Sequence, residues 1–119
     1  MKLQMPKISE VEFEVICEAE EIPVKGNVSA SGNDEIDARI EHDVIEDLES
    51  GNDWAWCCVT VWAYWKDFSG RDNLGGCSYA SKKDFMKPGG YYDDMKKQAY
   101  DDLIREIQSR ADEIETLVV

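Results

Sequence analysis

Apolar and polar residues alternate near the start of the chain. In residues 10–17 every second position is apolar, and glutamates occupy most of the positions between them; the apolar set is Val11, Phe13, Val15 and Cys17. A period of two is typical of a strand with one buried face. Residues 22–29 predict a weaker second strand, which Pro23 and Gly26 would place at a sheet edge.

A period of four follows in the next segment. Asn33 or Asp34 can cap the start of a helix, and Gly51 can end it. The apolar stripe of this helix, expected to face the sheet, consists of Ile36, Ile40, Val44 and Leu48. Asp37 and Glu41 fall inside or beside the apolar arc, so the inner face is not purely apolar.

Residues 54–65 (WAWCCVTVWAYW) are the most apolar segment of the chain. Both alternating faces are largely apolar, which predicts a central strand that is covered on both sides or lies at a partner surface. One face would carry Trp54, Trp56, Cys58, Thr60, Trp62 and Tyr64. A returning strand is predicted over residues 72–79, where Gly75 and Gly76 suggest a bulge or the close approach of another backbone.

Two further helical segments complete the pattern. Ser81 can cap a short turn through Phe85, and a long helix is expected from about Tyr91. Helical spacing relates the apolar residues Tyr92, Met95, Ala99, Leu103, Ile107, Ile114 and Leu117. The order ββαββ(α)α predicts a single α+β domain over residues 1–119, with an antiparallel sheet of about four strands and two main helices.

Charge is spread unevenly over this pattern. The formal net charge is −13, and residues 1–53 hold 15 acidic against 4 basic residues. Such a field repels nucleic acid and membrane surfaces and attracts basic grooves. No stretch of the chain approaches the run of about 20 apolar residues that a membrane span needs, and no signal peptide opens the chain, so a cytoplasmic location is expected.

The residues that usually carry catalysis are sparse. His42 is the only histidine, and the four cysteines form no CxxC pair, so no catalytic residue, cofactor or metal site is expected. Gly75-Gly76-Cys77 is similar to the surroundings of some cysteine nucleophiles, but no base can be assigned to Cys77. Buried, reduced thiols are favoured for Cys17, Cys57, Cys58 and Cys77, with a disulfide between strands as the alternative.

Two surfaces are candidates for binding. An acidic surface would combine a strand and a neighbouring helix, through Glu10, Glu12, Glu14, Glu35, Asp43, Glu46 and Glu49. Glutamates two apart on a strand repeat every ~6.7 Å, and DNA advances roughly 3.4 Å per phosphate, so such rows can imitate phosphates. Solubility alone is the competing explanation. An aromatic surface would use Trp54, Trp56 and Trp62, although core packing is the favoured explanation for most of them.

Three segments that precede an amphipathic helix read DWAWCCVTVWAYW, LGGCSYAS and PGGYYDDM. In these segments the chain resembles a group of short acidic proteins of bacteriophages, prophages and plasmids. The resemblance runs from about Gly26 through the last helix. It implies an accessory role and, by analogy of class, an inhibitor of the anti-CRISPR or anti-restriction type. It supplies no catalytic residues.

These observations together predict a non-enzymatic inhibitor in the host bacterial cytoplasm. It would act as a DNA mimic on a host nucleic-acid-binding defence complex, with no direct nucleic-acid binding and no membrane contact. The alternative is a phage accessory or adaptor protein that binds a protein partner, or forms a homodimer, through the aromatic sheet face.

Overall fold

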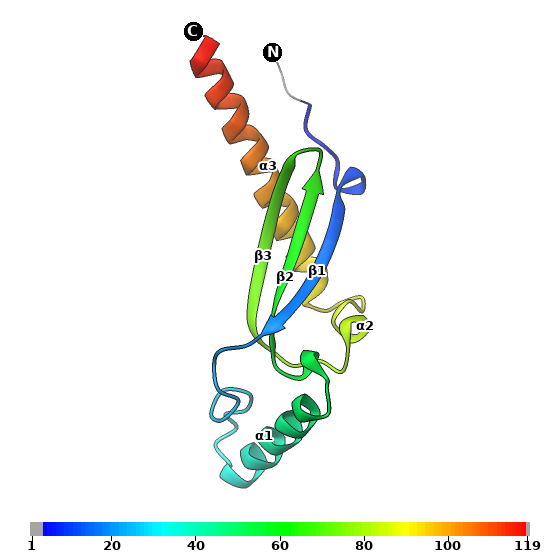
Figure 1. The fold of residues 1–119 in the computed structure, drawn as a ribbon, viewed down its shortest axis with the longest axis vertical. Helices are drawn as coiled ribbons and strands as arrows, with labels where there is room; N and C mark the ends of the chain where they lie inside the picture. The colour runs from blue at the N-terminus through cyan, green and yellow to red at the C-terminus, as the bar shows by residue number, and fades with distance from the viewer. Residues whose placement is uncertain (1–3, 119) are drawn as a thin grey trace.

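A computed structural model describes the backbone of residues 4–118 and the side chains of residues 4–113. Its elements, in chain order, are η1 (Ile8–Glu10), β1 (Glu12–Ala19), α1 (Asp34–Glu49), η2 (Asp53–Ala55), β2 (Cys57–Trp65), β3 (Phe68–Cys77), α2 (Lys82–Phe85) and α3 (Tyr91–Val118). The molecule is elongated, 65 × 24 × 23 Å, because α1 lies beyond one end of the sheet and α3 projects beyond the other (Figure 1).

The sheet is antiparallel with the order β1-β2-β3, so the predicted α+β class with two main helices is confirmed. It has three strands rather than about four, because residues 22–29 form a turn. The N–H groups of Asn27 and Val28 both donate to the Val24 carbonyl, at 3.1 and 3.2 Å. The backbone at Gly26 is left-handed (φ 80°), which reverses the chain where the prediction had an edge strand.

The main core lies between one face of the sheet and α3. Alternate residues of β2, from Cys57 to Ala63, have no solvent exposure. The stripe predicted for the long helix meets them through Met95, Ala99, Leu103 and Ile107, which confirms the helical spacing. The side chains of Ile114 and Leu117, also placed on that stripe, lie outside the described residues. Among the described elements, α3 is the one helix that packs along the sheet (Figure 1). Of the two alternatives predicted for β2, cover on both sides is therefore wrong, and a partner surface stays a prediction.

The returning strand begins earlier than predicted, at Phe68, and it contains the expected bulge. Cys57 pairs with Cys77 and Val59 with Leu74, which leaves one extra residue on β3 at Gly75-Gly76. Gly76 adopts a left-handed backbone (φ 64°), as the bulged position requires. The close approach of another backbone, the other possibility considered for these glycines, occurs instead at Gly70, which faces α3.

The helix α1 does not pack on the sheet, so the expectation that its stripe faces the sheet is wrong, and only half of the stripe is buried at all. Val44 is buried and Leu48 partly buried, in a small second cluster with Val24 and Trp56. Ile36 and Ile40 are 46% and 38% exposed. The apolar face of the sheet is occupied by α3, so α1 packs instead against the loop that precedes it and the short segment that follows it.

The two acids in the apolar arc of α1 explain how this helix is held. The Asp37 carboxylate accepts hydrogen bonds from the Ser29 hydroxyl at 2.7 Å and from Ser31. The Glu41 carboxylate accepts from the Gly26 N–H at 3.2 Å. Polar contacts to the preceding loop thus replace the apolar contacts that the stripe had predicted.

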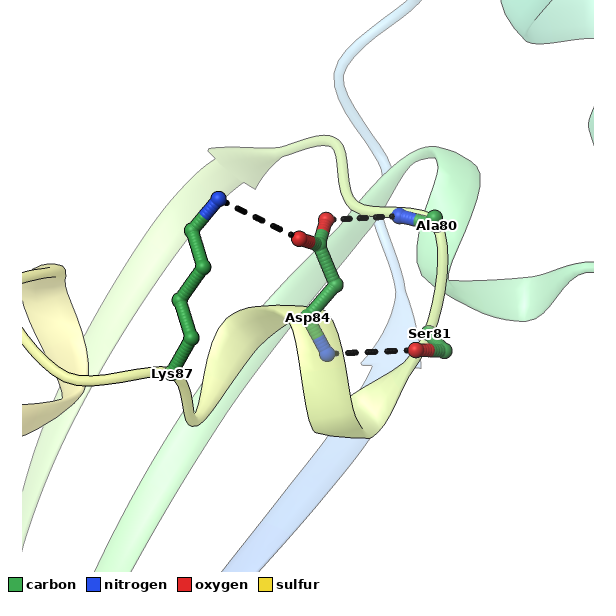
Figure 2. A network of polar contacts seen from close by, with 4 residues as sticks. All are labelled: Ala80, Ser81, Asp84 and Lys87. Carbon is green, nitrogen blue, oxygen red and sulfur yellow. Dashed lines mark hydrogen bonds and ion pairs between the residues drawn. The ribbon is translucent and has the colours of Figure 1, made fainter.

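The short helix α2 begins at the predicted cap, Ser81, whose hydroxyl accepts from the Asp84 N–H at 3.1 Å (Figure 2). The Asp84 carboxylate in turn accepts from the Ala80 N–H and forms an ion pair with Lys87 (Figure 2). This network places Phe85 in the main core, where its ring stacks on Trp54 with 5.5 Å between centroids.

Candidate functional site

The candidate site is the face of the sheet opposite α3, which we call the open face. It is formed by the strand positions that alternate with the buried ones, and Figure 1 shows no element lying across it. Its members are Glu12, Glu14, Ile16 and Glu18 of β1, Cys58, Thr60, Trp62 and Tyr64 of β2, and Ser69, Arg71 and Asn73 of β3.

The strand register brings acids and aromatic rings together on this face. Glu12 pairs with Tyr64, and Glu14 pairs with Trp62. Side chains directly opposite on neighbouring antiparallel strands are about 4.5–5.5 Å apart at Cβ and interact. Two of the predicted acids and one of the predicted tryptophans, assigned to alternative surfaces by the sequence, therefore share one face.

The aromatic centre of the open face is ordered by ring contacts. The rings of Trp62 and Tyr64 stack nearly parallel, with 5.9 Å between centroids and 10° between planes. The guanidinium of Arg71, on the neighbouring strand β3, lies 5.3 Å from the centroid of the Trp62 ring. Such a cluster presents flat, preorganised rings, which lose little conformational freedom when a partner covers them.

The carboxylates influence this centre electrostatically. Partial burial, followed by the charge and a hydrogen bond of Glu14, raises the pKa of the Tyr64 hydroxyl above its ordinary value. Tyr64 therefore stays neutral and can donate a hydrogen bond at physiological pH. The glutamates of β1 are all exposed, so their charge is free to act on an approaching partner.

The remaining predicted acids lie away from the open face. The Glu10 carboxylate accepts from the N–H of Lys7 at 3.0 Å within η1, before β1 begins. The other four, Glu35, Asp43, Glu46 and Glu49, are exposed on α1. Because α1 lies beyond the end of the sheet, the expected row beside β1 is not formed (Figure 1). The α1 acids instead extend the negative field along the molecule.

The three predicted tryptophans separate in space, because β2 begins only at Cys57. Trp54 packs in the main core against Phe85 and Tyr79. Trp56 is 5% exposed in the second cluster, and its indole N–H donates to the Ile22 carbonyl at 2.7 Å. Of the three, only Trp62 lies on the open face.

Several members of the open face were missed as site residues. Glu18 continues the alternation of β1 by one more step, and Arg71 pairs with Trp62 across β2 and β3. Extending the period of two past Cys17 would have found Glu18. Arg71 required the register of the hairpin, which a sequence alone does not supply.

Burial disfavours the reactive thiolate form of the cysteines. All four cysteines are free. Burial is the main cause that raises the pKa of each thiol, that of Cys77 to about 11, and the thiolate is accordingly disfavoured at neutral pH. His42 lies on the exposed face of α1, with its Nε2 atom 3.5 Å from the Glu46 carboxylate. Within residues 4–113, no group of three or more His, Cys, Asp or Glu side chains is arranged to hold a metal ion.

None of the described helices combines the length and the apolar character that crossing a bilayer demands. Comparison with protein-family models, curated proteins and solved structures finds no match for this chain.

Proposed function

We propose that this chain is a non-enzymatic binding protein of the anti-defence type, which inhibits a host nucleic-acid-binding complex by occupying its basic surface. The observation that carries the proposal is the pairing of Glu12 with Tyr64 and of Glu14 with Trp62 on the open face. The inhibitor class itself comes from the resemblance to phage and plasmid proteins, and it places the action in the host cytoplasm.

The chemistry of the open face suits a protein partner better than a nucleic acid. Aromatic rings on a sheet can stack on bases, but binding of this kind also needs basic residues for the phosphates. Here two glutamates lie opposite the rings, a third shares their face, and Arg71 is the only basic residue among the face members. Tryptophan, tyrosine and arginine are the side chains that most often anchor protein interfaces, and the glutamates would meet lysines or arginines at the rim.

Long-range charge supports the same partner. Residues 1–53 hold 15 of the 26 acidic residues, and they include both β1 and α1. A negative field along an elongated molecule steers it toward Lys/Arg-rich grooves that otherwise hold DNA or RNA, which raises the association rate. In this mechanism the carboxylates take the place of phosphates, and the Trp62 and Tyr64 rings supply the short-range contacts that slow dissociation.

The test is affinity capture from a bacterial lysate at low and at high salt, followed by competition with DNA for the recovered complex. The wild type should recover a nucleic-acid-binding complex that DNA displaces, and recovery should fall as salt rises. The double variant Glu12→Lys/Glu14→Lys should lose recovery through slower association, and Trp62→Ala should lose it through faster dissociation.

A matched control uses the outward acids of α3. The variant Glu106→Lys/Glu113→Lys makes the same change in net charge at two exposed positions outside the open face. It should retain most of the binding. Equal losses in both double variants would mean that only net charge matters, and no loss in either would reject the acidic surface. A third pair, Glu35→Lys/Glu46→Lys, measures how much α1 contributes.

The second candidate is an adaptor that binds a partner, or a second copy, through the aromatic centre alone. It is favoured by the partial exposure of the stacked Trp62–Tyr64 pair in the described structure. Binding of this kind would resist salt and depend on Trp62 but not on Glu12 or Glu14. Light scattering of the wild type and of Trp62→Ala over a concentration series distinguishes a homodimer from a complex with another protein.

A further inference from the structure

The two edges of the sheet are not equivalent. On β3, the Arg71 N–H donates to the Asp102 carboxylate of α3 at 2.9 Å, and the bulge at Gly75-Gly76 interrupts the regular ladder. A bulge and a side-chain partner of this kind hinder the addition of another strand. The β3 edge is therefore protected by its bulge and by Asp102.

The hydrogen bond from the Arg71 N–H also determines which backbone N–H and C=O groups of β1, the opposite edge strand, point away from the sheet. Since the Arg71 N–H points away from β2, Arg71 and Trp62 form a pair that exchanges no backbone hydrogen bonds. The peptide groups of Trp62 then point toward β1 and bond to Glu14, its register partner. Bonded and non-bonded pairs alternate along an antiparallel ladder, so the outward groups of β1 belong to Phe13, Val15 and Cys17.

These outward groups have no partner within the described part of the chain. No hydrogen bond from residues 4–118 reaches the backbone N–H or C=O of Phe13, Val15 or Cys17 from outside the sheet. The strand is eight residues long and pairs with β2 in one continuous register, without a bulge. It is a regular, unoccupied edge onto which an extended chain can pair.

The side chains beside this edge define what such a chain would carry. On the open face, β1 presents the exposed carboxylates of Glu12, Glu14 and Glu18. On the other face it presents Phe13, Val15 and Cys17, which belong to or pack against the main core. An added strand would therefore meet negative charge with one set of alternating side chains and apolar surface with the other.

A second copy of this chain does not fit. Antiparallel pairing of two β1 strands about Val15 would place Glu12 of each copy opposite Glu18 of the other. A shift that centres the pairing on Phe13 would place Glu12 opposite Glu14, and a shift to Cys17 would place Glu14 opposite Glu20. Like charges directly opposite destabilise a strand pair. The edge glutamates thus exclude self-pairing while they favour a basic strand.

We propose that the β1 edge accepts an extended segment of the target protein as a fourth antiparallel strand, in which lysine or arginine alternates with apolar residues. The basic side chains pair with Glu12, Glu14 and Glu18, and the apolar ones extend the core beside Phe13 and Val15. Backbone bonds to β1 supply affinity and the alternating side chains supply specificity. This inference rests on the proposed function for the identity of the protein that provides the segment.

The probe is a synthetic peptide of eight residues, the length of β1, in which lysine alternates with valine. It is added at low salt to the isotope-labelled full chain, and amide hydrogen exchange is measured by NMR. The amides of Phe13, Val15 and Cys17 should become protected, because each gains a hydrogen bond. Failure of the peptide to bind, or binding without protection at these three amides, overturns the proposal.

Two methylated peptides provide a matched control. In the proposed register the valines lie opposite Phe13, Val15 and Cys17, so their N–H groups face β1 and the lysine N–H groups face solvent. Methylation of the valine nitrogens should weaken binding at least about tenfold, whereas methylation of the lysine nitrogens should change it less than about twofold. Equal affinity of the two methylated peptides would show that the backbone edge is not used.

The outcomes separate this inference from the proposed function. If the valine-methylated peptide binds as tightly as the unmodified one while Trp62→Ala still abolishes capture of the nucleic-acid-binding complex, strand addition is rejected and the proposed function stands. If peptide binding follows the expected pattern but no such complex is captured, the strand-accepting edge is supported and the proposed function is rejected.

Discussion

The backbone of Leu103 in α3 lies directly against Gly70 of β3. A Cβ at residue 70 would overlap the Leu103 backbone nitrogen and would lie 2.6 Å from the Ala99 carbonyl oxygen. Both obstacles are helix backbone, which cannot rotate away as a side chain would. Gly70 thus sets the distance between α3 and the sheet, and it does so on the face opposite the candidate site.

The first prediction follows from that contact. Gly70→Ala should destabilise the fold by about 3 kcal/mol or more, because α3 must shift away from its core contacts. Gly90→Ala is the control: the nearest atom to its Cβ lies at 3.5 Å, so stability should stay within about 0.5 kcal/mol. Urea unfolding measures both. Similar midpoints for the two variants would show that α3 is not held against β3 at Gly70.

The second prediction concerns the independence of α1. Val44→Ala should cost about 1–3 kcal/mol, because Val44 is buried in the small second cluster, whereas Ile36→Ala, at an exposed position, should cost less than about 0.5. Hydrogen exchange should show the loss of protection confined to α1, while β2 and α3 stay protected. Loss of protection in β2 at the same rate would mean that the two clusters unfold as one.

The third prediction is a dependence on acid. The Gly76 and Ile22 N–H groups, which donate to Glu20 at 2.7 and 3.2 Å, hold the pKa of that carboxyl below its usual range. Because the folded pKa lies below the unfolded one, the stabilisation is fully present above the unfolded pKa of about 4.3 and is lost as pH falls through the folded pKa.

The check is a comparison of wild type with Glu20→Gln in urea across pH. The wild type should be the more stable protein at neutral pH, and the gap should narrow below about pH 4 as the carboxylate is protonated. The stabilisation by Asp37 should also be lost as pH falls, since hydrogen bonds from Ser29 and Ser31 lower the pKa of its carboxyl. A gap that stays constant with pH would show that Glu20 makes no charged contact in the folded state.

The fourth prediction is the order in which the thiols react. Cys57 and Cys77 are buried and their pKa values are raised, that of Cys77 to about 11, so at neutral pH both should resist iodoacetamide until the protein unfolds. Cys58 lies partly exposed on the open face and should react first. Mass spectrometry of partly alkylated protein reads the order. Rapid labelling of Cys77 in the folded protein would contradict this prediction and would make Cys77 a candidate nucleophile.

The long helix shows what sequence periodicity predicts well. The spacing from Met95 through Ala99 and Leu103 to Ile107 predicted a buried stripe, and all four residues are buried against the sheet. The alternation of β1 was equally reliable. In both elements the apolar period matches the geometry of the element, and the stripe has a large surface to cover.

The same kind of pattern gave a wrong prediction for α1, because α1 and α3 compete for one face of the sheet. Its stripe from Ile36 to Leu48 is no less periodic than that of α3, yet Ile36 and Ile40 remain exposed. One face of a sheet with three strands is filled by α3. Periodicity states which side of a helix is apolar, but not which of two helices obtains the available surface.

The candidate site, likewise, was predicted in part from the sequence and decided in part by the tertiary structure. The sequence by itself determined that β1 carries glutamates on one side, that Trp62 and Tyr64 share a strand face, and that the charge gathers in the first half of the chain. Only the tertiary structure decided that Glu14 pairs with Trp62, that Trp54 and Trp56 are packed in clusters, and that the α1 acids lie beyond the sheet. The physical reason is that periodicity arises from local backbone geometry, whereas register, the start of a strand and the choice of packing partner depend on contacts between residues far apart in the chain.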